Sequence, residues 1–115
     1  MNEKKFGFKT RALHAGTSPD PQTGARALPI YQNTAFVFED TEDAGNLFAL
    51  QKYGNIYSRI ANPTVSALEE KIASLEGGLG AVATASGQAA QFLTFAALAG
   101  AGDHVVASSN LYGGT

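Results

Sequence analysis

Apolar positions in the middle of the chain recur with the three-to-four-residue period of a helix. They would form one stripe of a helix over residues 63–76, made of Val65, Leu68, Ile72 and Leu75. Asn62 is a favoured N-cap, Pro63 suits the first helical position, and Gly77 with Gly78 can end the helix. The pattern therefore predicts a helix with defined ends.

A shorter periodic stretch predicts a helix that is capped by Thr41 or by Asp40 just before it. Its predicted inner face consists of Ala44, Leu47, Phe48 and Gln51. Glu42 and Asp43 fall in the first turn, where the helix dipole favours negative charge. The helix dipole therefore explains why acidic residues gather at this point of the chain, and a catalytic pair of carboxylates is not needed to account for them.

The last third of the chain alternates between two kinds of pattern. Residues 81–85 and 104–107 are short apolar runs typical of buried strands, and residues 88–99 between them are long enough for three helical turns. A strand, a helix and a strand in this order imply parallel strands with a right-handed crossover. The predicted fold class is α/β, with this unit as the start of a mostly parallel sheet.

The first forty residues show no sustained period and are punctuated by proline and glycine, which predicts an arm that lies over another part of the protein. We expect residues 1–60 to form this N-terminal arm, with one short helix and the segment that carries Tyr57 and Arg59. Residues 61–115 would begin the sheet domain.

Charge and composition exclude several classes of partner. Eight basic against 10 acidic residues give a net charge of −2, which argues against nucleic acid or an anionic membrane as the main partner. The basic cluster of Lys4, Lys5, Lys9 and Arg11 is interpreted as a solvated arm. The chain has no cysteine, and no apolar segment predicts a signal peptide or membrane anchor, so we expect a soluble cytoplasmic protein.

Tyr57 and Arg59 are the strongest candidates for binding an anion. Residues two apart in an extended segment project to the same side, so the hydroxyl and the guanidinium can converge on one anion such as phosphate. The helix predicted from Pro63 anchors this pair, because Asn62 caps it only a few residues further on.

A second candidate anion site lies at Ser86-Gly87-Gln88, where the first predicted strand turns into a helix. The free N–H groups of a first helical turn can hold phosphate, and Gly87 permits close approach. An ordinary tight turn is the alternative. Tyr112, after the second predicted strand, could stack on a flat ligand there or simply pack in the core.

Other chemistry finds little support. His14 and His104 are 90 positions apart and have no neighbouring ligand spacing, so no metal site is expected. Residues 77–80 are rich in glycine but follow a helix, the wrong order for a phosphate loop. None of the five lysines lies beside the Ser86 turn, where an amine nucleophile would be expected; they are Lys4, Lys5, Lys9, Lys52 and Lys71.

Several of these motifs occur together and in order over almost the whole chain. They are Thr10-Arg11-Ala12-Leu13-His14-Ala15-Gly16, Pro29-Ile30-Tyr31-Gln32, Gly54-Asn55-Ile56-Tyr57-Ser58-Arg59, Asn62-Pro63-Thr64, Leu75-Glu76-Gly77-Gly78, Ala85-Ser86-Gly87 and Leu111-Tyr112-Gly113-Gly114-Thr115. In this combination the chain resembles the pyridoxal-phosphate enzymes of cysteine and methionine metabolism, and within them the O-acetylhomoserine sulfhydrylase branch.

The resemblance implies the fold type I of pyridoxal-phosphate transferases, with an N-terminal arm before a three-layer domain that is incomplete here. It also implies roles for the candidate residues. Gly87 and Gln88 would present backbone N–H groups to the phosphate of pyridoxal 5'-phosphate, and Tyr112 would stack on the pyridine ring and assist near the departing group. Tyr57 and Arg59 would reach the cofactor phosphate of a neighbouring subunit in a tetramer of tight dimers.

The implied reaction replaces the acetate of O-acetylhomoserine with sulfide and gives homocysteine. The family's cofactor-binding lysine and its substrate-carboxylate arginine belong to later parts of the family's chain, so these residues resemble the first quarter of such an enzyme. Cystathionine γ-synthase and methionine γ-lyase remain alternatives within the family. A non-catalytic assembly module and a small nucleotide-binding domain are alternatives of other classes.

Overall fold

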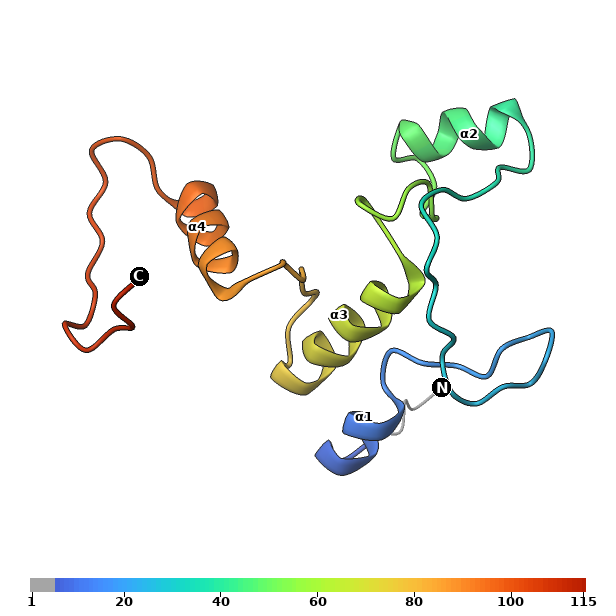
Figure 1. Cartoon of the computed structure of the whole chain (residues 1–115), viewed down its shortest axis with the longest axis horizontal. Coiled ribbons are helices and arrows are strands. Elements are labelled where there is room, and N and C mark those ends of the chain that lie inside the picture. The colour runs from blue at the N-terminus through green and yellow to red at the C-terminus, as the bar shows by residue number, and fades with distance from the viewer. Residues whose placement is uncertain (1–5) are drawn as a thin grey trace. The chain divides into compact units, whose positions relative to one another are not determined.

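The computed structural model describes residues 6–115, which form four helices (Figure 1). The chain divides into two compact units, Met1–Ala81 and Val82–Thr115. Helices α1 (Phe8–His14), α2 (Thr41–Phe48) and α3 (Pro63–Glu76) belong to the first unit, and α4 (Gly87–Leu98) belongs to the second. Of the predicted basic cluster, Lys4 and Lys5 lie outside the described residues.

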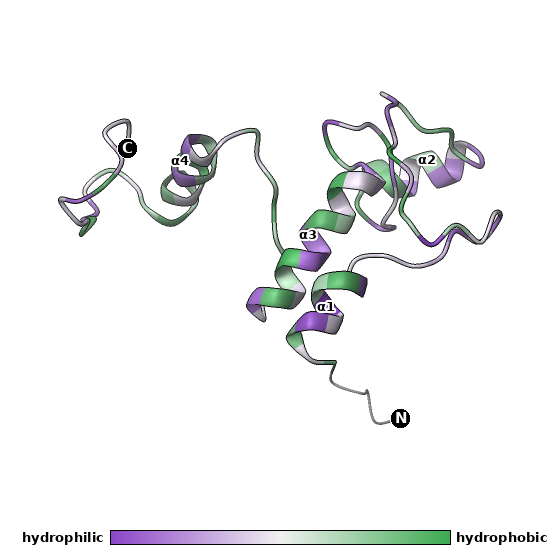
Figure 2. Cartoon of the chain, turned by 60° about the horizontal axis from the view of Figure 1, so that its bottom comes forward, coloured by the Kyte–Doolittle hydropathy of each residue, from purple (hydrophilic) through white to green (hydrophobic). Residues whose placement is uncertain are grey.

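Helix α1 interrupts the arm that the sequence predicted to be irregular, so that prediction was wrong for residues 8–14. The helix packs beside α3 (Figure 2). The Arg11 guanidinium donates through Nη1 to the carbonyl of Ser74 in the last turn of α3. Arg11 is therefore not a solvated residue of the arm, since it satisfies a carbonyl that the helix end leaves without an intrahelical partner.

Gly16 allows the chain after α1 to pass close to α3. Its φ is +71°, in the left-handed region that favours glycine, and a Cβ built on it would lie 2.2 Å from the carbonyl oxygen of Ala67. The side-by-side packing of α1 and α3 thus depends on the absence of a side chain at this position.

Helix α3 has the predicted bounds, Pro63 to Glu76. The Asn62 side chain accepts a hydrogen bond from Thr64 N, and Gly77 ends the helix with a φ of +70°, which confirms both predicted caps. The predicted inner stripe does not form the core of the unit, because Val65, Leu68 and Ile72 are exposed. The periodicity identified the apolar face of the helix, and most of this face is exposed in the described residues.

Helix α2 is capped by Asp40, whose carboxylate accepts from Asp43 N at 2.8 Å. Leu47 of the predicted inner face is buried. Phe48 is exposed but its ring lies against that of Phe38, with centroids 6.0 Å apart. Gln51 lies beyond the end of the helix, so it is not part of that face.

The second unit contains α4, which begins one residue before the predicted start and is capped by Ser86. The predicted strands at 81–85 and 104–107 are not formed, and residues 6–115 contain no paired strand beyond one isolated bridge between Ala35 and Tyr57. A strand exists only through a ladder of backbone hydrogen bonds to a neighbouring strand, and the described residues form no such ladder at either segment. The start of the parallel sheet therefore stays a prediction.

Candidate functional site

The backbone around Tyr57 is fixed by pairing with the arm. Tyr57 forms the antiparallel bridge with Ala35, and Ser58 N donates to Thr34 O at 2.8 Å while Phe36 N donates to Ile56 O at 3.2 Å. This short ladder joins two segments that are more than 20 residues apart in the chain. It holds the start of the candidate anion-binding segment in place.

Arg59 lies over the ring of Tyr57, with its Cζ 5.5 Å from the ring centroid. The two side chains are close, but not because the whole segment is extended. Ile60 N and Ala61 N both donate to Tyr57 O, at 2.8 and 3.0 Å, so the chain turns after Tyr57. The guanidinium keeps its donors available while the ring orients it through a cation–π contact.

Asn62 connects this turn to the arm. Its Nδ2 donates to Tyr31 O at 3.0 Å and to Ser58 Oγ at 2.9 Å, in addition to the N-cap bond that its Oδ1 accepts from Thr64 N. The side chain of Thr64 in turn accepts from Tyr31 N at 3.0 Å. From the sequence we identified Asn62 only as a cap, because local signals cannot show which distant carbonyl its amide reaches.

A hollow of about 420 Å³ lies beside this network of bonds, and most of its lining residues are polar. The lining comes from the arm and from the start of α3: Ile30, Tyr31, Gln32, Asn33, Thr34, Ser58, Asn62, Thr64 and Val65. We did not anticipate this hollow from the sequence, since the lining residues of the arm show no motif for a ligand.

The second candidate site is the first turn of α4. Ala89 N and Ala90 N donate to the hydroxyl and the carbonyl of Ser86, each at 3.1 Å. Within the described part of the chain, no acceptor takes the N–H of Gly87 or Gln88. A Cβ built on Gly87 would have no atom within 4 Å. The turn therefore offers two free donors and open space at the positive end of a helix, which suits an anion.

The chain end returns to this turn within the second unit. Gln88 Nε2 donates to Thr115 Oγ1 at 3.5 Å, and a Cβ built on Gly114 would lie 3.0 Å from Tyr112 Cε1 and 3.4 Å from Gln88 Nε2. Tyr112 is 81% exposed, so its ring is free to meet a ligand. Gln88 and Tyr112, both candidates from the sequence, are thus brought to one place.

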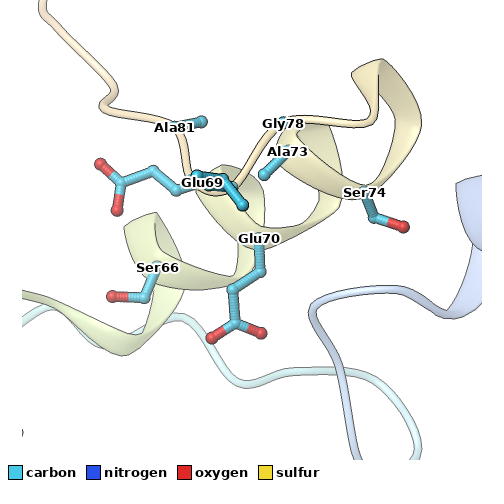
Figure 3. Close-up of a pocket in the computed structure, with 9 residues that line it drawn as sticks. Ser66, Glu69, Glu70, Ala73, Ser74, Gly78 and Ala81 are labelled. Atoms are coloured by element: carbon cyan, nitrogen blue, oxygen red, sulfur yellow. The ribbon is translucent and has the colours of Figure 1, made fainter.

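A separate hollow of about 420 Å³ lies between α3 and the segment that follows it (Figure 3). Ser66, Glu69, Glu70 and Ala73 of α3 line one side, and residues 78–81 line the other. None of the candidate residues reaches it. Gly77 ends α3, as the sequence predicted, and Gly78 and Gly80 border this hollow.

No titratable group with a shifted pKa among the described residues belongs to either candidate site. The hydrogen bond from Lys52 Nζ to Asp43, 2.5 Å long, lowers the pKa of the Asp43 carboxyl and raises the pKa of Lys52. The backbone N–H of Thr23 lowers the pKa of Asp20 in the arm. These carboxylates act as a helix-start ion pair and a turn, not as general acids or bases.

No group of three or more potential metal ligands occurs among residues 6–115. His14 Nδ1 lies 2.5 Å from its hydrogen-bond partner Arg26 Nη2. No helix in the described residues is long and apolar enough to span a membrane.

Comparison with known proteins identifies relatives of this chain. It is 60% identical to the O-acetyl-L-homoserine sulfhydrylase of Corynebacterium glutamicum over 114 residues, which are 99% of this chain and 26% of the relative. It is 49% identical to the L-methionine gamma-lyase of Fusobacterium nucleatum over 115 residues, 100% of this chain and 29% of that protein. The chain thus spans about a quarter of the length of these relatives.

Among solved structures, a protein described as an O-acetylhomoserine (thiol)-lyase from Campylobacter jejuni matches with a TM-score of 0.87 and 45% identity. The match covers 95% of this chain and 27% of that one, which contains an N'-pyridoxyl-lysine-5'-monophosphate. The family model described as "Cys/Met metabolism PLP-dependent enzyme" matches residues 9–115. The chain therefore belongs to the family of pyridoxal-phosphate-dependent enzymes of cysteine and methionine metabolism.

Proposed function

We propose that this chain is part of an O-acetyl-L-homoserine sulfhydrylase, which replaces the acetate of O-acetylhomoserine with sulfide and forms homocysteine. Membership of the family supports pyridoxal phosphate as the cofactor. The higher identity to a sulfhydrylase, 60% against 49% to a methionine γ-lyase, supports this branch of the family. The observation that carries the proposal is the presence of anion-binding groups at the turn of α4 and at Tyr57 with Arg59.

The first turn of α4 fits the cofactor phosphate. The free N–H groups of Gly87 and Gln88 would donate to phosphate oxygens, and the space around Gly87 leaves room for them. Tyr112 lies in the same unit and would place its ring on the pyridine face. Bound pyridoxal phosphate supplies an electron sink for carbanions of the substrate. The residues of this chain would hold and orient it.

Tyr57 and Arg59 would bind the phosphate of a cofactor held by a neighbouring subunit, in a tetramer of tight dimers. The closeness of the guanidinium to the Tyr57 ring supports this role, because it keeps the two candidate side chains next to each other. The lysine that carries the cofactor would come from the rest of the enzyme. The Tyr112 hydroxyl would hold or move a proton near the leaving group.

Arg59→Ala in the complete enzyme tests the cofactor contact. We expect affinity for pyridoxal phosphate to fall by about tenfold or more, because a hydrogen bond to a charged group contributes roughly 1.5–3 kcal/mol. Fluorescence titration of the apoenzyme measures this change. Unchanged affinity would instead favour a module that serves only assembly.

The acceptor of the reaction distinguishes the branches of the family. We expect the complete enzyme to form homocysteine from O-acetylhomoserine and sulfide more efficiently than it forms cystathionine from cysteine. A preference for cysteine would assign it to the cystathionine γ-synthases. Cleavage of methionine without either replacement reaction would assign it to the methionine γ-lyases.

A further inference from the structure

Asn62 is the buried polar side chain of the described residues, with 6% of its surface exposed. A buried amide is stable only if its donors and acceptor are satisfied. Here both groups are bonded: Nδ2 donates to Tyr31 O and Ser58 Oγ, and Oδ1 accepts from Thr64 N, all at 2.9–3.0 Å. An N-cap needs only the last of these bonds. The two bonds that Nδ2 donates are therefore not needed to cap the helix.

The donated bonds join three segments at one point. Ser58 lies directly between Tyr57 and Arg59 in the chain. Its hydroxyl also donates to Asn33 O, so it links Asn62 to a second residue of the arm. The Tyr31 peptide is held from both sides, since its carbonyl accepts from Asn62 and its N–H donates to Thr64 Oγ1. Asn62 thereby ties the turn that carries Arg59 to the arm and to the rigid start of α3.

We propose that Asn62 is a positioning residue for the phosphate contact of Tyr57 and Arg59. Its amide holds the turn so that the guanidinium stays over the Tyr57 ring before the anion arrives. Without the two donated bonds, the turn is free to move relative to α3, and binding has to order it first. This role rests on the proposed function, because it requires that the pair bind the cofactor phosphate.

Asn62→Ser separates the positioning role from the cap role. Serine is as good an N-cap as asparagine and adds no charge, but its single hydroxyl cannot reach both Tyr31 O and Ser58 Oγ while accepting from Thr64 N. The matched control is Asp40→Ser, which puts serine at the N-cap of α2, away from Tyr57 and Arg59. Ser58→Ala removes the two bonds of the Ser58 hydroxyl, from Asn62 Nδ2 and to Asn33 O, leaves the bond from Asn62 to Tyr31 O, and serves as a second variant.

The measurement is the ratio of the dissociation constants of the complete apoenzyme for pyridoxal and for pyridoxal phosphate, which isolates the phosphate contact. We expect Asn62→Ser to lower this ratio about tenfold, equivalent to about 1.4 kcal/mol, since binding must then order the turn that the lost bonds had held. We expect the affinity for pyridoxal itself to stay unchanged. Ser58→Ala should lower the ratio less, and Asp40→Ser should leave it unchanged.

A double-variant cycle shows whether Asn62 acts through Arg59. In an Arg59→Ala background, Asn62→Ser should cause no further loss. An unchanged ratio in Asn62→Ser, or losses that add independently of Arg59, would overturn the positioning role while the proposed cofactor contact stands. If Asn62→Ser does not fold, an unchanged ratio in Ser58→Ala would overturn it equally. An unchanged ratio in Arg59→Ala alone would instead refute the proposed function.

Discussion

The close passage of Gly16 over α3 leads to a quantitative prediction about stability. Gly16→Ala places a Cβ 2.2 Å from Ala67 O and 3.1 Å from Lys71 N, both backbone atoms that cannot rotate away. It also forces alanine into the left-handed region, at a φ of +71°. The first effect is a clash between the chain that follows α1 and the backbone of α3, and the second is a local conformational cost.

Gly24→Ala separates the two effects. Gly24 has nearly the same φ, +70°, but a Cβ built on it meets nothing within 4 Å. Its replacement should cost only the left-handed penalty, about 1–2 kcal/mol. Gly16→Ala should cost a further 1–3 kcal/mol or so, because overpacking forces the backbone to shift. The difference between the two variants therefore measures the clash alone.

Hydrogen exchange in the complete enzyme is the assay, since it reports local opening. The amides of Arg11 and Ala15 donate along α1, to Gly7 O and Arg11 O, and should lose protection in Gly16→Ala but not in Gly24→Ala. Denaturant unfolding gives the accompanying change in free energy. Equal effects of the two variants on both measurements would refute the argument that α1 packs against α3 through Gly16.

Three further predictions concern the ion pair, the cap of α4 and the Tyr112 ring. The pKa of Asp43 is lower in the folded protein than in the unfolded chain. The stability that this carboxylate contributes is therefore present above its unfolded pKa and should be lost as the pH falls through its folded pKa. Asp43→Asn should abolish this pH dependence in acid unfolding curves. Ser86→Ala should destabilise α4 by about 1 kcal/mol through loss of its cap, measured as faster amide exchange of Ala89. Tyr112→Phe should keep cofactor affinity, whereas Tyr112→Ala should lower it, in the same titration used for Arg59.

Each of these expectations has a defined contrary result. An acid unfolding curve that is identical in Asp43→Asn would show that the pair with Lys52 contributes nothing. Unchanged exchange at Ala89 would contradict the capping role of Ser86. Equal cofactor affinity in Tyr112→Phe and Tyr112→Ala would mean that the ring does not contact the cofactor.

The helix boundaries could be predicted because their signals are local. Asn62, Pro63 and Gly77 fix the ends of α3 through backbone geometry and nearby hydrogen bonds, which any neighbouring structure leaves intact. Helix α1 escaped prediction since it has no side-chain cap and only 7 residues. A helix that short is stable only through packing, and here that packing is against α3.

The sequence by itself determined the three longer helices, the apolar faces and the set of residue types that identify the family, since caps, periods and motifs act over a few residues. Tertiary structure alone decided that Asn62 reaches Tyr31, that Tyr57 pairs with Ala35, and that Gly16 lies against Ala67. These contacts join segments that are remote in sequence. No local pattern encodes them, because their energy comes from the partner that the fold brings near.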